Sequence, residues 1–218
     1  MPAINTVKHC FANGYYHIYN RGLNKSNIFL DDQDFVSFLH LLKLYLTPGL
    51  KVIRKDPRSK KPIEVTPNYC YSKIRLLSYC LMPNHFHLIC QLLEVDGMKD
   101  FMRKISNQYT SVFNKRHERE GMVFGGIYRA VSIISADHLT KVAAYIHTNP
   151  YKIVKCGRVE DYQYSSLFHI HRNDTIPWIN YDDVVLDRKG TKYTDFVKNC
   201  YNSKVFDGIH SLLIDDSD

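Results

Sequence analysis

The sequence predicts an α+β fold of the ferredoxin-like kind, in which a β-α-β-β-α-β chain forms an antiparallel sheet with helices on one face, followed by a C-terminal extension. Three observations support this. Hydrophobic residues make up 44% of the 218 residues and aromatics 13%, enough to build a core. Segments with strand-like alternation are interspersed with segments of helical periodicity. The order of these segments matches the ferredoxin-like pattern.

The chain begins with a strand, a helix and a loop. Residues 15–21 alternate and are rich in aromatics that favour strands. Asp31-Asp32 can cap a helix whose apolar residues recur at helical spacing, and Pro48-Gly49 ends it. Residues 51–61 carry six basic residues against one acidic residue and lie near prolines, so we expect a loop there.

The middle of the chain supplies a hairpin and a second helix. The segments 73–81 and 85–92 predict two strands joined by the turn Met82-Pro83-Asn84. Residues 98–117 place Met98, Phe101, Met102, Ile105, Tyr109 and Val112 on one stripe, which predicts a helix.

The last predicted strand and a third helix follow. Residues 128–134 indicate the strand. Ser135 is a typical N-cap for a helix at 136–148, which Pro150 stops. Beyond 150 the pattern indicates loops and one helix around 191–201. We therefore expect one domain over residues 1–170 with a basic insertion at about 47–70, and an extension over 171–218.

Several classes of protein are disfavoured. The chain has no stretch of 18 apolar residues and no apolar block with a cleavage site near its start, so we expect no membrane span and no secretion. The six cysteines form no Cys-x-x-Cys pair, which disfavours a zinc ribbon or a disulfide framework. These features predict a cytoplasmic protein.

The charge is distributed unevenly. Residues 1–173 carry 24 Lys and Arg against 13 Asp and Glu, a net +11, whereas residues 174–218 carry 5 against 9, a net −4. A basic body favours a polyanionic partner such as nucleic acid. Net charge also serves solubility, and charge alone leaves both interpretations open.

The segment His85-Phe86-His87 is the sharpest local motif. Alternate residues of a strand share a face, so the two imidazoles project together while Phe86 enters the other side. Two imidazoles about 6–7 Å apart at Cα suit one divalent ion, given a rise of about 3.3 Å per residue. The alternative is two half-exposed histidines on a sheet. A metal site also needs a third ligand from elsewhere.

Tyrosines on the predicted helices are candidate nucleophiles. Tyr145 and Asn149 are spaced i, i+4, so they stack on the flank of the apolar stripe at 136–148. Tyr145 can equally be a rim residue and Asn149 a helix cap. Tyr109 is the rival, although its place on an apolar stripe favours a packing role. Basic residues Arg103, Arg119 and Arg129 could line a DNA backbone groove, with stacking platforms at Tyr15, Tyr16 and Tyr128.

These residues together resemble a known family. The segments YYHIYNRG (15–22), LLSYCLMPNHFHLI (76–89), FMRKISNQYTSVFNKRH (101–117), FGGIYRA (124–130), AAYIHTNPYKIVK (143–155) and DYQYSS (161–166) are similar to the single-tyrosine HUH transposases, and most of all to the REP-associated tyrosine transposase (IS200-like) branch. The resemblance covers residues 15–170 in collinear order. The combination of MPNHFH with YIHTNP about 58 residues later is specific.

The resemblance implies a ferredoxin-like fold and metal-dependent cleavage of single-stranded DNA flanked by hairpins, through a 5′-phosphotyrosine. It makes His85, His87 and Asn149 the metal ligands and Tyr145 the nucleophile, with Tyr109 as the runner-up. Imidazole and amide ligands suit Mg²⁺ or Mn²⁺. The basic residues expected to bind DNA are Arg54, Lys55, Arg58, Lys60, Lys61, Arg103, Lys104, Lys115, Arg116 and Arg129.

The chain departs from its relatives in places. Relatives often carry Trp near the position of Phe124 and Arg at that of Ile127, so the resemblance implies that a DNA contact is missing here. The resemblance leaves a monomer and a homodimer open. The alternative function is a non-catalytic, single-stranded nucleic-acid-binding module of the same fold, which would need no metal.

Overall fold

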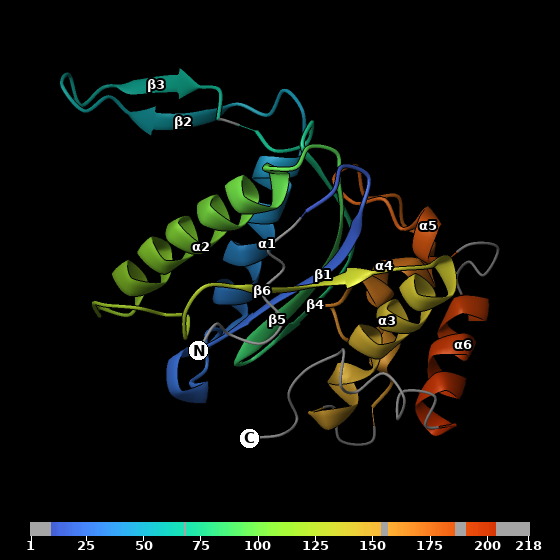
Figure 1. Ribbon diagram of the computed structural model, residues 1–218. Helices are drawn as coiled ribbons and strands as arrows, with labels where there is room; N and C mark the ends of the chain where they lie inside the picture. Colours follow the sequence, from blue (N-terminus) through green and yellow to red (C-terminus); the bar gives the residue numbers. More distant parts are fainter. Residues whose placement is uncertain (1–9, 68, 154–156, 186–190, 204–218) are drawn as a thin grey trace, which may run out of the picture.

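The computed structural model describes residues 10–67, 69–153, 157–185 and 191–203, and it shows a four-stranded antiparallel sheet in the order β4-β5-β1-β6 (Figure 1). Strand β5 lies between β1 and β4, and β1 lies between β5 and β6. The two strands of each β-α-β unit are therefore separated by one strand of the other unit. This is the predicted ferredoxin-like fold. Its strands are β1 (Tyr15–Arg21), β4 (Ile74–Met82), β5 (His85–Leu92) and β6 (Arg129–Ile133).

One face of the sheet is covered by two helices, α1 (Asp32–Leu46) and α2 (Gly97–Arg116). Helix α1 begins at the predicted cap, where the Asp31 carboxylate accepts a hydrogen bond from the Asp34 amide at 3.1 Å. The apolar stripe of α2 packs against α1 and the sheet, and only its last predicted member, Val112, is partly exposed. The short helix η1 (Leu23–Lys25) connects β1 to this layer.

The opposite face is covered by α3 and by elements of the extension (Figure 1). Helix α3 (Ala136–Thr148) begins at Ser135, whose hydroxyl accepts from the His138 amide at 3.1 Å, as predicted. Because both faces are covered, β4 and β5 are almost continuously buried. The remaining elements are η2 (Asn149–Lys152), η3 (Val159–Asp161), α4 (Ser166–Arg172), α5 (Asp182–Val185) and α6 (Thr191–Asn202).

The segment at 51–61 is not the expected loop. It belongs to a two-stranded hairpin of β2 (Val52–Lys55) and β3 (Pro62–Val65), which projects away from the main sheet (Figure 1). The Asp56 carboxylate accepts from the Arg58 and Ser59 amides and so closes its turn. Both faces of the hairpin are largely exposed, so the alternation that reveals a half-buried strand is missing.

The outer edge of β4 is paired by segments from later in the chain. The Leu81 amide donates to the Tyr164 carbonyl at 2.9 Å, and the Asn180 amide donates to the Leu76 carbonyl at 2.8 Å. The Trp178 ring also stacks on Tyr79 at a centroid distance of 6.0 Å. Residues beyond 170 thus share the core of the sheet. In the described ranges, no helix is long and apolar enough to cross a membrane.

Candidate active site

The two histidines of the motif lie on the sheet face that α3 covers. Strand register places Arg21 opposite His85 and Tyr19 opposite His87, so all four side chains share this face. Phe86 lies on the other face, fully buried against Phe38. Strand alternation therefore separates the imidazoles from the aromatic core, as the sequence predicts.

Each imidazole is held through its Nδ1 atom. The two rings are nearly perpendicular, with centroids 4.9 Å apart. The Nδ1 of His85 is 2.6 Å from the Asn84 side-chain oxygen, which can only accept a hydrogen bond, so this Nδ1 carries the proton and Nε2 carries the lone pair. The Nδ1 of His87 is 2.9 Å from Nε2 of His17. Metal-binding histidines are typically oriented by such a bond at the second nitrogen.

The electrostatic surroundings keep His87 neutral. Burial lowers the pKa of its imidazole well below 6.5, and the neighbouring His85, His17 and Lys152 lower it further. Burial likewise lowers the pKa of His17 to about 3, with a smaller contribution from His138. A neutral imidazole is the form that ligates a metal ion.

Helix α3 brings the candidate nucleophile to the histidines. The Tyr145 ring is 6.3 Å from the His87 ring between centroids, at an interplanar angle of 80°, and the side chain is only 5% exposed. One turn later, the Asn149 amide nitrogen donates to the carbonyls of Tyr145 and Ile146 at 3.2 and 3.4 Å. This leaves the Asn149 amide oxygen as the atom for a ligand.

A buried polar cluster around His147 holds α3 against its neighbouring elements. His147 Nε2 is 2.9 Å from the Ser78 hydroxyl of β4 and 2.8 Å from the Ser166 hydroxyl of α4. Its Nδ1 is 3.1 Å from the Tyr193 hydroxyl of α6. These bonds join the helix that carries Tyr145 to the sheet and to the C-terminal helices. Sequence alone places Tyr145 on a flank, whereas in the structure it is buried and its ring contacts His87 of the sheet.

Tyr109 is in a different environment. Its ring lies on the α1–α2 side of the sheet, fully buried among Phe38, Phe113 and Phe124. The hydroxyl donates to the Ile28 carbonyl. Burial raises the pKa of this phenol far above 10, and Asp34 raises it further. The structure therefore brings Tyr145, and not Tyr109, next to the histidine pair.

The predicted DNA-binding residues fall into two groups, on the hairpin and around α2. Those of the hairpin are all exposed: Arg54, Lys55, Arg58, Lys60 and Lys61. On α2, Arg103 and Lys115 are exposed, and Lys104 lies 3.4 Å from the Cys70 sulfur. Arg129 lies on β6 across from Tyr19, on the face of the histidine pair.

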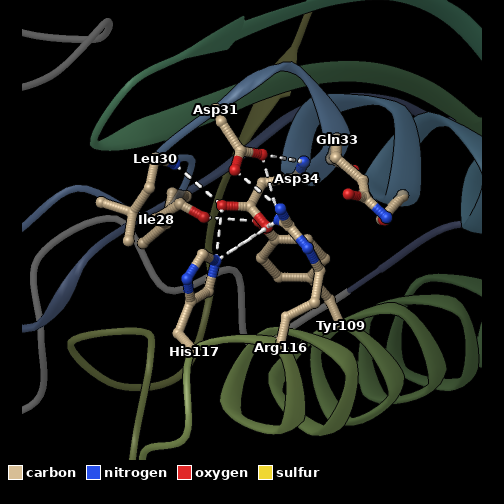
Figure 2. Close-up of polar contacts among 9 residues, drawn as sticks. Ile28, Leu30, Asp31, Gln33, Asp34, Tyr109, Arg116 and His117 are labelled. Atoms are coloured by element: carbon tan, nitrogen blue, oxygen red, sulfur yellow. Dashed lines mark hydrogen bonds and ion pairs between the residues drawn. The ribbon is translucent and has the colours of Figure 1, made fainter.

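Arg116 pairs with carboxylates of the protein itself. Its guanidinium pairs with the carboxylates of Asp31 and Asp34, and His117 Nε2 lies 2.9 Å from Asp34 (Figure 2). The Asp34 carboxylate also accepts from the Leu30 amide at 2.9 Å. This cluster ties the start of α1 to the end of α2, so Arg116 is engaged within the protein.

Three residues near the histidine pair were not among the sequence predictions. His17, Arg21 and Lys152 all lie near the histidine pair. The alternation of β1 puts Tyr15, His17, Tyr19 and Arg21 on one face, which is a readable signal, but their partner strand is not readable from spacing. Tyr16, expected to stack with bases, is a core residue whose hydroxyl accepts from the Phe11 amide at 2.9 Å.

The donor set at this place fits one divalent ion. Within the described part of the chain, no three His, Cys, Asp or Glu residues are grouped as metal ligands, so the histidine pair needs a donor of another type. The donor that the sequence resemblance implies is the amide oxygen of Asn149, the first residue of η2. Mixed nitrogen and oxygen ligands with positions left for substrate are compatible with Mg²⁺ or Mn²⁺.

Comparisons with known proteins agree with this fold. Residues 50–149 match the family model described as "Transposase IS200 like". A solved structure of a REP-associated tyrosine transposase bound to a REP hairpin has a similar fold, with a TM-score of 0.54 and 15% identity, over 81% of this chain and 90% of that chain. No curated protein matches significantly. Residues 50–149 are thus similar to the IS200-like transposases, and the fold of the chain is similar to that of a REP-associated tyrosine transposase.

Proposed function

We propose that the protein is a transposase-type endonuclease and strand transferase that cleaves single-stranded DNA beside hairpins, using a divalent metal and a 5′-phosphotyrosine intermediate. The observation that carries the proposal is the approach of Tyr145 on α3 to His87 on β5, at 6.3 Å between ring centroids. The two residues are 58 positions apart in sequence and meet only because α3 covers this face of the sheet.

The ion-binding role falls to His85 and His87 through Nε2 and to Asn149 through its amide oxygen. A divalent ion held there would polarise the scissile phosphate and stabilise the charge that develops during transfer. Asn84 and His17 hold the imidazoles in orientation, and the His147 cluster holds the helix of Tyr145 and Asn149.

Tyr145 is the group that reacts. Its phenolic oxygen attacks the phosphorus, forming a tyrosine–phosphate bond as the bond from phosphorus to the 3′ oxygen breaks. The phenol loses its proton, and the released 3′ oxygen gains one to become a hydroxyl. The covalent link keeps the energy of the phosphodiester, so a 3′-hydroxyl of a second strand can reverse the step without ATP.

Basic residues on the same face support the binding of a phosphate backbone. Arg21 is the direct cross-strand neighbour of His85, and its Nε is buried without a hydrogen-bond partner among the described residues. Arg129 and Lys152 bring further positive charge to this end of the sheet. A phosphate would give such groups the charge-assisted hydrogen bonds that Arg forms well.

The hairpin-flanked substrate is supported by the comparison structure, whose transposase is bound to a REP hairpin. The exposed basic residues of β2 and of the turn between β2 and β3 offer additional backbone contacts at a distance from the histidine pair. We further propose that residues 1–170 form the catalytic domain and that 171–218 are an extension. A monomer and a homodimer remain compatible with this proposal.

The test is the formation of a covalent adduct. Wild-type protein is incubated with Mn²⁺ and a pool of labelled single-stranded hairpin DNA, and a denaturing gel is read for DNA attached to protein. We expect an adduct that is lost in Tyr145→Phe and kept in Tyr109→Phe. Loss only in Tyr109→Phe would overturn the assignment of the nucleophile.

The same gel separates other functions. A metal-dependent hydrolase would release cut DNA without an adduct, because its nucleophile is water. A non-catalytic binding module would bind the pool but show neither cut nor adduct, with or without Mn²⁺. Either result would refute the proposed function.

A further inference from the structure

His87 has a buried partner, His17, which is not one of the proposed metal ligands. His17 lies on β1, is 1% exposed and stacks on His87 with ring centroids 5.1 Å apart and an interplanar angle of 24°. Its Nε2 is 2.9 Å from Nδ1 of His87. The two rings are thus joined by one hydrogen bond whose direction depends on where the protons lie.

Two proton arrangements satisfy this bond, and they have opposite consequences. If His17 donates, Nδ1 of His87 is the acceptor and the single proton of neutral His87 lies on Nε2. That nitrogen then has no lone pair for an ion. If His87 donates from Nδ1, then Nε2 of His87 carries the lone pair. Only the second arrangement allows His87 to ligate a metal.

An imidazole at position 17 is costly for the fold alone. Its Nδ1 is buried and has no hydrogen-bond partner among the described residues. Its cross-strand neighbours are Ile89 and Val131, both apolar. An apolar side chain would fill this place without leaving a buried polar atom unpaired. The position is therefore better explained by a role toward His87 than by packing.

We propose that His17 is a positioning residue that accepts the Nδ1–H of His87 and thereby presents the Nε2 lone pair of His87 to the metal. The inference rests on the proposed function, in which His87 is a ligand. It adds a buried outer layer to the site, in which Asn84 serves His85 and His17 serves His87 in the same way. Residues in such an outer layer typically change metal affinity 10–100-fold.

The first measurement is the position of the protons without any metal. Long-range ¹⁵N–¹H correlation spectra of the full chain, assigned with His17→Gln and His87→Gln variants, report which nitrogen of each ring is protonated. We expect a protonated Nδ1 on both rings. A proton on Nε2 of His87 would overturn the proposal.

The second measurement is Mn²⁺ affinity, read from the free-ion signal in electron paramagnetic resonance. His17→Phe keeps an aromatic ring but removes the acceptor, so we expect about 10–100-fold weaker binding. His17→Gln returns an acceptor near the position of Nε2 and should recover much of the affinity. Tyr16→Phe is the matched control, because it alters a buried polar group of the same strand on the opposite face.

The outcomes separate this inference from the function on which it rests. The proposed metal site itself would be contradicted if wild-type protein bound no Mn²⁺. It would also be contradicted if the Mn²⁺ affinity were unchanged in His85→Ala. Intact wild-type binding that is equally weakened by His17→Phe, His17→Gln and Tyr16→Phe would show only a structural role for β1. Weakening in His17→Phe alone, with unchanged DNA affinity in EDTA, supports the positioning role.

Discussion

The Asp34 carboxylate is the clearest place to perturb the scaffold without touching the site. Its side chain is 1% exposed, and it accepts from the Leu30 amide at 2.9 Å. It also lies 2.9 Å from His117 Nε2 and pairs with Arg116 (Figure 2). Asp34→Asn keeps the size and one acceptor but removes the charge that these partners face.

The expected cost follows from these contacts. Hydrogen bonds to a charged group contribute about 1.5–3 kcal/mol, and breaking a buried ion pair costs about 3–5 kcal/mol. Arg116 keeps its bond to Asp31 and is 25% exposed, so its charge is not stranded. We therefore expect a loss near the lower end, about 2–3 kcal/mol. For a chain of this size that lowers Tm by about 4–12 °C.

The assay is urea unfolding followed by the fluorescence of Trp178, the single tryptophan, which stacks on Tyr79. Asp137→Asn is the control, because its ion pair with Lys141 is exposed and should change stability by at most about 1 kcal/mol. A loss in Asp34→Asn no larger than that in Asp137→Asn would refute the reasoning, because the buried carboxylate would then matter no more than an exposed one.

Three further predictions concern the core, the pH dependence and the DNA interface. Tyr109→Phe leaves the Ile28 carbonyl without its donor, so urea unfolding should show a loss of about 1–3 kcal/mol while adduct formation persists; loss of the adduct would contradict this. Burial raises the pKa of Glu160, but the hydrogen bond from Lys198 at 2.7 Å and nearby charges lower it more, so the net pKa lies below 4.5. The ionised form is thus favoured in the folded state, and its stabilisation is present above about pH 4.5 and lost as pH falls through the lower folded pKa. The difference in unfolding free energy between wild type and Glu160→Gln, measured by urea unfolding, should therefore be largest at pH 7 and narrow as the pH falls below 4.5, and a gap independent of pH would contradict this. Arg21→Gln should lower the slope of log affinity against log salt for single-stranded DNA in EDTA by about 0.7, one phosphate contact, and an unchanged slope would remove Arg21 from the interface.

Local signals were sufficient for much of the fold and part of the site. The Ser135 cap and the apolar period of α3, and the alternation around Phe86, depend only on neighbouring residues, and the structure agrees with both. The pairing of His17 with His87 joins positions 70 apart, so no spacing rule reveals it. The β2–β3 hairpin was not predicted because both of its faces are exposed to solvent, so its residues do not alternate between buried and exposed positions.

The ion pairs of Arg116 could not be predicted for a related reason. A basic residue near the end of a helix has the same sequence signature whether it faces solvent or a buried carboxylate. Asp34 is 82 positions away, and only the packing of α1 on α2 brings the two together. Likewise, the burial of Tyr145 against His87 joins positions 58 apart, so helical periodicity alone does not predict it.

The pairing of the outer edge of β4 bears on how the chain can be shortened. Strand β4 runs nine residues and is buried almost throughout, with Leu81 and Leu76 bonded by Tyr164 and Asn180. A chain cut before residue 164 would keep every residue of the proposed chemistry yet expose a long apolar edge with open amide and carbonyl groups. Such edges recruit strands from other molecules. The segments after residue 163 that pair with β4 thus protect the protein from aggregation, and a chain cut before residue 164 should form insoluble assemblies before its chemistry can be measured.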